Sequence, residues 1–139
     1  MTERILLLGD FSPVEAFSPT FSSHTIFHST VSSVRSSLDL NRYDLVLLNL
    51  ETPVSPDRIK RRKSGPSLTG NETIISAFLK QNMVVNLANN HIMDHGAEGL
   101  KKTLEVCNDR NVVCFGAGID ISSASAPVIK EVKGMTIGI

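Results

Sequence analysis

The chain has 139 residues, of which 41% are hydrophobic and 20% are charged, an ordinary balance for one globular domain with a buried core. Fourteen basic and fourteen acidic side chains give a formal net charge of zero. This composition argues against a disordered chain, and against a protein that binds nucleic acid or anionic membranes through its net charge.

Two sequence features indicate the cellular compartment of the chain. Cys107 and Cys114 lie seven residues apart without a metal-binding spacing, which predicts reduced, partly buried thiols of a reducing compartment. Near the N-terminus, the apolar run from Ile5 to Leu8 is too short for a signal peptide or a membrane span. The sequence therefore predicts a cytoplasmic chain with no membrane segment.

Strand and helix patterns alternate along the chain. Short continuous apolar runs, typical of strands buried on both faces, occupy residues 4–9, 44–50, 83–88 and 112–115. Residues 126–139 predict a hairpin that turns at Lys133-Gly134. Apolar strands separated by helices of about three turns predict an α/β layered fold with a mainly parallel sheet.

Helical spacing appears in two segments. The first is "GNETIISAFLKQN", residues 70–82. This helix would start either at a capping box of Thr69 and Glu72 or at an N-cap formed by Asn71. The second is residues 97–109, where Gly99 costs about 1 kcal/mol of helix propensity. Packing against the rest of the protein must therefore hold this second helix.

Two segments are ambiguous. In the serine-rich residues 18–37, "SHTIFHST" fits a strand and "VSSVRSSLDL" a short helix, and we expect His24 and His28 to be surface or core residues. Residues 52–68 predict a long loop. Its basic run, residues 58–63, favours a solvated segment, with contact to an anionic polymer or phosphate as the alternative.

Polar side chains follow three of the predicted strands. Asp10 ends the first apolar run, residues 49–51 end the second with Glu51, and Asn89-Asn90-His91 follow the third. Because ligands bind outside the carboxyl ends of parallel strands, we expect these clusters to meet at one edge of the sheet.

The chemistry of these clusters indicates a metal site. Asp10, Glu51, Asn90 and His91 supply two carboxylates, an amide oxygen and an imidazole, which suit divalent cations. Two carboxylates brought together without a cation would repel each other. Taken singly, each residue is better explained by helix capping or solvation than by metal binding, but the three clusters together favour a metal site.

The same residues carry a family resemblance. "LLLGD", "DLVLLNLETPV", "LANNHIMDHGAEGLKKTLE" and "GAG…APVI" resemble, in order, the capsule synthesis CapA family, named for poly-gamma-glutamate synthesis. That family belongs to the calcineurin-like metallophosphoesterases. The resemblance implies a β-sandwich flanked by helices and a site with two divalent metal ions of Mn, Fe or Zn type.

The resemblance also implies residue roles. Asp10, Glu51 and Asn90 match metal ligands, and His91 matches the histidine that stabilises or protonates the leaving oxygen. Asp94 lies close enough in sequence to orient His91, an inference from its position. The expected partner is an anionic polymer or a phosphate-containing substrate.

The chain departs from the superfamily pattern in two places. Ser12 stands where the superfamily has a metal-binding histidine, and no histidine follows His95. The sequence also ends within an apolar run. We therefore expect residues 1–139 to be the N-terminal part of a single longer domain, inactive by itself, whose open edge an oligomer could cover.

Two functions remain open from the sequence. The first is a metal-dependent phosphoesterase-like hydrolase associated with capsule or exopolymer synthesis. The alternative is a non-catalytic binding or scaffold module of a polymer synthesis complex that keeps the fold, which Ser12 and the missing downstream histidines support.

Overall fold

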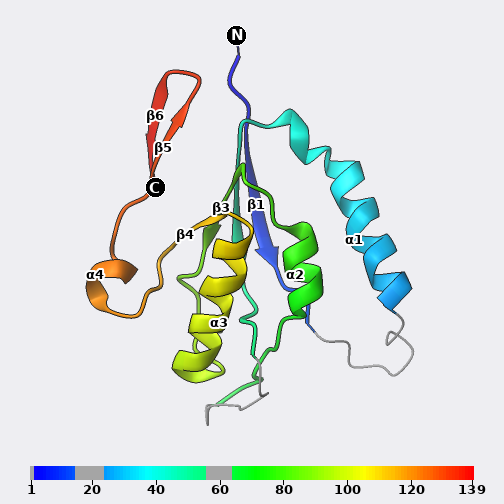
Figure 1. The fold of residues 1–139 in the computed structure, drawn as a ribbon, viewed down its shortest axis with the longest axis vertical. Coiled ribbons are helices and arrows are strands. Elements are labelled where there is room, and N and C mark those ends of the chain that lie inside the picture. Colours follow the sequence, from blue (N-terminus) through cyan, green and yellow to red (C-terminus); the bar gives the residue numbers. More distant parts are fainter. Residues whose placement is uncertain (1, 15–23, 56–63) are drawn as a thin grey trace.

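The computed structural model describes residues 2–14, 24–55 and 64–139. Its helical elements are α1 (His24–Leu38), the 3-10 turn η2 (Leu40–Arg42), α2 (Glu72–Phe78), α3 (Gly96–Asp109) and α4 (Ile121–Ala124). Its strands are β1 (Ile5–Phe11), β2 (Leu45–Leu50), β3 (Met83–Asn86), β4 (Val113–Phe115), β5 (Ile129–Val132) and β6 (Met135–Gly138). Figure 1 shows their arrangement.

The first four strands form one parallel sheet in the order β1-β2-β3-β4. This confirms the predicted α/β class. The hairpin of residues 126–139 is also confirmed, because β5 and β6 pair antiparallel. Lys133 and Gly134 connect them with φ of 47° and 87°, the left-handed backbone that a tight hairpin turn requires.

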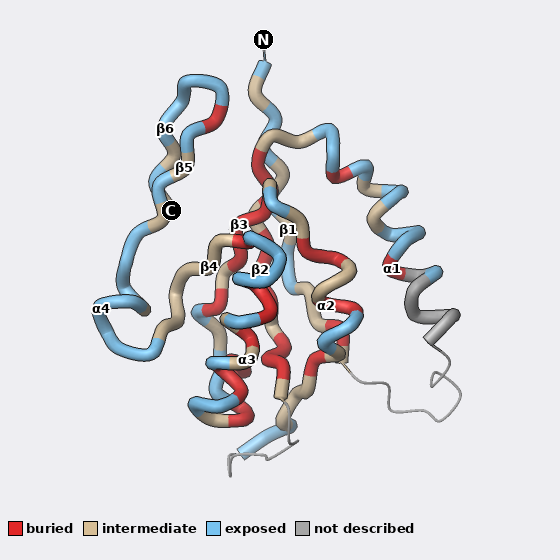
Figure 2. The backbone as a smooth tube through the Cα atoms, viewed as in Figure 1, coloured by how far each residue is buried: buried red, intermediate tan, exposed pale blue. Residues whose placement is uncertain are grey.

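Helices α1, α2 and α3 bury their apolar side chains against one face of the sheet. Val46, Leu48 and Leu50 of β2 face this core, and Ile75 of α2 and Leu100 of α3 pack with them. Figure 2 shows the buried positions concentrated where the helices meet the sheet. β2 and β3 are buried on both faces, as their apolar runs predict. The same prediction is wrong for residues 4–9, because β1 is an edge strand whose Ile5 and Leu7 are 40% and 72% exposed.

The opposite face of the sheet carries the hairpin. Leu45 and Val84, which point away from the helices, form a smaller core with Val132 of β5. The Lys133 ammonium also lies 2.9 Å from the Asp44 carboxylate, just before β2. A complete β-sandwich stays a prediction, because the second sheet in the described residues has two strands.

The ambiguous serine-rich segment is helical where it is described. The strand alternative for "SHTIFHST" is wrong, because α1 runs from His24 and places Val31 in the core. Local helix and strand propensities did not distinguish a helix from a strand in this segment. The packing of Val31 in the core favours the helix. The basic run of residues 58–63 lies outside the described residues.

The cap of α2 is Asn71, whose side chain accepts the Ile74 N–H at 3.1 Å. The alternative capping box with Thr69 is wrong, because the Thr69 hydroxyl contacts His95 instead. In the described part of the chain, no helix is both long and apolar enough to cross a bilayer.

The two cysteines are free, with Cys107 buried and Cys114 half-buried, as predicted. A hydrogen bond with the Cys114 side chain, together with burial, raises the pKa of the Cys107 thiol. Cys107 therefore stays a protonated core residue at neutral pH rather than a reactive thiolate.

The Asp44 carboxylate makes folding pH-dependent. Its hydrogen bonds with Lys133 and the Arg4 N–H lower its pKa below the ordinary 3.8. A lowered pKa stabilises the fold above the ordinary value, and the contribution is lost as the pH falls below 3.8 through the folded pKa. We expect Asp44→Asn to be less stable than wild type at pH 7, with the gap closing toward pH 2, in urea unfolding.

Glu98→Gln is the control for this prediction, because Glu98 forms an exposed ion pair with Lys101 within α3. Its stability should follow that of the wild type at each pH. An Asp44→Asn gap that stays constant from pH 7 to pH 2 would contradict the role of this carboxylate.

Candidate functional site

The carboxyl ends of β1, β2 and β3 meet at one edge of the sheet, the lower edge in Figure 1. In the register of the sheet, Asp10 pairs with Asn49, and Asn49 pairs with Asn86. Three polar residues of neighbouring strands therefore stand side by side, as parallel pairing requires.

Their side chains form a chain of hydrogen bonds across the strands. Asn49 Nδ2 donates to Asp10 Oδ1 at 2.7 Å, and Asn86 Nδ2 donates to Asn49 Oδ1 at 3.0 Å. Asn86 Oδ1 in turn accepts the Ala88 N–H at 3.0 Å. The Asp10 carboxylate is thus oriented by an amide whose own orientation is set by the next strand.

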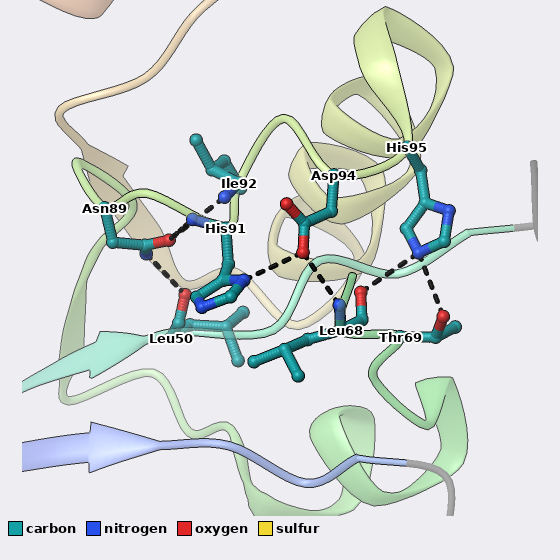
Figure 3. A network of polar contacts seen from close by, with 8 residues as sticks. All are labelled: Leu50, Leu68, Thr69, Asn89, His91, Ile92, Asp94 and His95. Carbon is teal, nitrogen blue, oxygen red and sulfur yellow. Dashed lines mark hydrogen bonds and ion pairs between the residues drawn. The ribbon is translucent and has the colours of Figure 1, made fainter. Parts of the chain in front are cut away.

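Asn89 ties the loop after β3 to the sheet. Its Nδ2 donates to Asn49 Oδ1 at 3.2 Å and to the Leu50 carbonyl at 2.9 Å. Its Oδ1 accepts the N–H groups of His91 and Ile92, both at 3.0 Å. One side chain therefore fixes the turn that carries His91 (Figure 3).

His91 and Asp94 form a buried pair in this turn. His91 Nδ1 lies 2.8 Å from Asp94 Oδ2, and the Asp94 side chain is 1% exposed. Asp94 Oδ2 also accepts the Leu68 N–H at 2.7 Å. An ionised Asp94 accepts a hydrogen from Nδ1, so it orients the imidazole ring and selects its tautomer.

A second histidine joins the same turn to the segment before α2. His95 Nε2 lies 2.9 Å from Thr69 Oγ1 and 3.0 Å from the Leu68 carbonyl (Figure 3). Gly99 of α3 packs so closely on His95 that an added Cβ would lie 2.5 Å from the His95 Cβ. This close packing offsets the helix-propensity cost of having a glycine at this position.

The predicted ligands Glu51 and Asn90 lie next to this network. Glu51 is half-buried, directly follows β2 and donates its N–H to the Phe11 carbonyl at 3.1 Å. Asn90 is exposed and adjoins Asn89, which contacts the end of β2. In the ranges that the structure describes, we find no hydrogen bond to the side chain of either residue.

Three residues to which the sequence assigned no role complete the site. Asn49, Asn86 and Asn89 connect the predicted ligand Asp10 to the turn of His91. A sequence signal was present, because Asn49 and Asn86 lie near the ends of apolar strand runs and Asn89 follows the second of these runs. Its meaning depends on strand register, which a single sequence does not provide.

The donor chemistry at this edge fits a hard divalent cation. Asp10 and Glu51 bring carboxylates and Asn90 an amide oxygen, and all three are exposed or half-buried. The described residues contain no cluster of three or more His, Cys, Asp or Glu able to hold a metal. A site here would therefore need the Asn90 oxygen beside the two carboxylates.

Comparison with known proteins places these observations in a family. The family model described as bacterial capsule synthesis protein PGA_cap matches residues 4–139. The chain is 34% identical over 97 residues to the "PGA biosynthesis protein CapA" of Bacillus subtilis (strain 168), covering 68% of this chain and 26% of that protein. It is 30% identical over 102 residues to the "Capsule biosynthesis protein CapA" of Bacillus anthracis, covering 70% and 25%. The chain thus spans about a quarter of the length of these curated relatives.

Proposed function

Because this chain belongs to the bacterial capsule synthesis family, we propose that it carries the first part of a metal-dependent phosphoesterase-like site that acts in capsule or exopolymer synthesis. The observation that carries the proposal is the His91–Asp94 pair, held beside the end of the sheet where Asp10 stands. Expected substrates are phosphate-containing compounds or an anionic polymer.

Asp10, Glu51 and Asn90 are the residues that would hold a divalent cation. When bound, the ion would supply Lewis-acid stabilisation of negative charge on a phosphoryl group. The chain's own contribution is orientation, because Asn49 fixes one oxygen of Asp10 at 2.7 Å before any ligand arrives.

His91 would handle the proton of the leaving oxygen. Asp94 engages Nδ1, so the exchange would take place at Nε2, the other ring nitrogen. In that role the ring would donate from Nε2 while Asp94 keeps its orientation fixed through Nδ1. Asn89 positions the His91 backbone against the sheet, which limits the movement of the ring.

Substitutions separate metal binding from turnover. We expect Asn90→Ala to weaken Mn²⁺ binding about 10-fold, because it removes one oxygen ligand. We expect His91→Ala to lower turnover of bis(p-nitrophenyl) phosphate about 100-fold with Mn²⁺ affinity unchanged, because it removes only the proton donor. Calorimetry of the chain measures the first effect and hydrolysis by the intact protein the second.

Asn108→Ala is the control, because Asn108 is an exposed residue of α3 away from the sheet edge. It should bind Mn²⁺ like the wild type. Equal Mn²⁺ affinity of Asn90→Ala and wild type would overturn the ligand assignment. Equal turnover of His91→Ala and wild type would overturn the role of the histidine.

The rival function is a binding or scaffold module. Ser12 at a position where the superfamily has a metal-binding histidine favours it, as does the small number of ionisable ligands clustered in the described residues. Stoichiometric Mn²⁺ uptake in dialysis would support the hydrolase, whereas substoichiometric uptake with unchanged folding would support the scaffold.

A further inference from the structure

A hollow lies at the opposite edge of the sheet from His91. Its volume is about 470 Å³, and it lies between the last turns of α1, the connection to β2 and the residues after α2. Figure 1 shows the α1–β2 and α2–β3 connections together at the upper edge. The side chains that matter here are Ser32, Arg35, Ser36, Asn41 and Lys80.

Two cations line this hollow without neutralising partners. Arg35 Nη1 donates to the Ala77 carbonyl, and Lys80 Nζ donates to Asn41 Oδ1 at 2.6 Å. Neither cation forms an ion pair with a carboxylate within the described ranges. The acid in the lining, Asp39, lies instead 3.6 Å from the Arg42 guanidinium.

The other groups in the hollow are suited to bind an oxyanion. Because Asn41 Oδ1 is engaged by Lys80, the Asn41 Nδ2 remains as a donor beside the ammonium. Ser32 and Ser36, one helical turn apart in α1, add two hydroxyl donors. The hydrogen bond to Ala77 holds the Arg35 guanidinium in place while its other N–H groups stay available.

We propose that this hollow binds the phosphate group of a small molecule. Two positive charges held in one hollow repel each other, and a phosphate, with nearly two negative charges at neutral pH, relieves that repulsion. Its oxygens can each accept from the cations, the hydroxyls or the amide. The volume is within the range of small-molecule sites.

The inference does not depend on the proposed catalytic site. The hollow is built at the amino-terminal ends of the strands, whereas Asp10 and His91 lie at the carboxyl ends. A phosphate bound here is therefore a ligand with its own site. Failure of either proposal leaves the other standing.

The test is a titration of the metal-free chain with inorganic phosphate, followed by amide chemical shifts in NMR spectra. We expect saturable shifts centred on residues 32–41 and 79–81. Lys80→Gln should weaken phosphate binding about 10-fold, because one charge-assisted hydrogen bond is lost. Lys101→Gln, on the exposed face of α3, is the matched control and should bind phosphate like the wild type.

Arg35→Gln should weaken binding by a similar factor, and Arg35→Lys should weaken it less because the charge is kept. Arg35 also joins α1 to α2 through Ala77, so Lys80→Gln keeps the test decisive if Arg35 variants fold poorly. Equal shifts with chloride or citrate at matched ionic strength would overturn the proposal, since they would show general charge attraction only. Unchanged affinity in Lys80→Gln would overturn it as well.

Discussion

Replacing Asp94 by Ala is expected to lower the free energy of unfolding by about 4 kcal/mol. The side chain is 1% exposed and accepts hydrogen bonds from the Leu68 N–H and the His91 ring, at 2.7 and 2.8 Å. Its removal leaves the half-buried Leu68 N–H and the buried His91 ring without this acceptor, and opens a gap between the turn and the residues before α2. Guanidinium chloride unfolding followed by circular dichroism measures the loss.

Asp94→Asn is the matched control, because it keeps the volume and one accepting oxygen. We expect it to lose about half as much stability as Asp94→Ala, since its oxygen can still accept the Leu68 N–H. That same oxygen position also faces His91 Nδ1, so Asp94→Asn should keep the imidazole tautomer with a hydrogen on Nδ1, which ¹⁵N shifts of the ring report. An Asp94→Ala variant within 1 kcal/mol of the wild type would show that this network contributes little to folding.

Replacing Gly116 by Ala is the second substitution with a large expected effect, a loss of about 3 kcal/mol. Gly116 follows β4 with φ of 82°, a backbone that an L side chain adopts at a cost. An added Cβ would also lie 2.6 Å from the Ala88 Cβ and 2.9 Å from its backbone N. The clash would also displace the loop that leads from β3 to His91 and to the proposed metal ligand Asn90.

Substitutions at two other glycines distinguish the cost of backbone strain from the cost of the steric clash with Ala88 in the same unfolding experiment. Gly134 also has a positive φ, 87°, but an added Cβ would meet nothing within 4 Å, so Gly134→Ala should cost about 1 kcal/mol. Gly9 of β1 has neither the strained φ nor a close neighbour, and Gly9→Ala should change stability by less than about 0.5 kcal/mol. If Gly116→Ala is no worse than Gly134→Ala, the contact with Ala88 is unimportant.

Much of the fold could be predicted because its two central strands, β2 and β3, are buried on both faces. Leu45 contacts the hairpin side and Val46 the helix side, so the run reads as continuously apolar. The hairpin turn could be predicted because the residue pair Lys133-Gly134 is itself a local sequence signal for a tight turn. Helix α1 could not be predicted with the same certainty, because serines are neutral in local preference and the buried contact of Val31 is long-range.

The site could be predicted as a set of chain positions but not as a geometry. The order of parallel strands brings Asp10, Glu51 and Asn90 to one edge whatever their neighbours are. Asp94 lies three residues after His91, and in the structure its Oδ2 lies 2.8 Å from His91 Nδ1, while the catalytic role of the pair stays a prediction. The role of Asn49 depends on its register with Asp10, which is a property of the folded sheet.

The order of the strands in the sheet is also their order along the chain. Each strand that leaves the ribosome can therefore add to an open edge, and none has to enter between two strands that are already paired. Asp10 and Glu51 can come together once the chain has passed β2, before Asn90 has been made. The ligand-bearing edge can thus assemble in the direction of synthesis, with the turn of His91 added last.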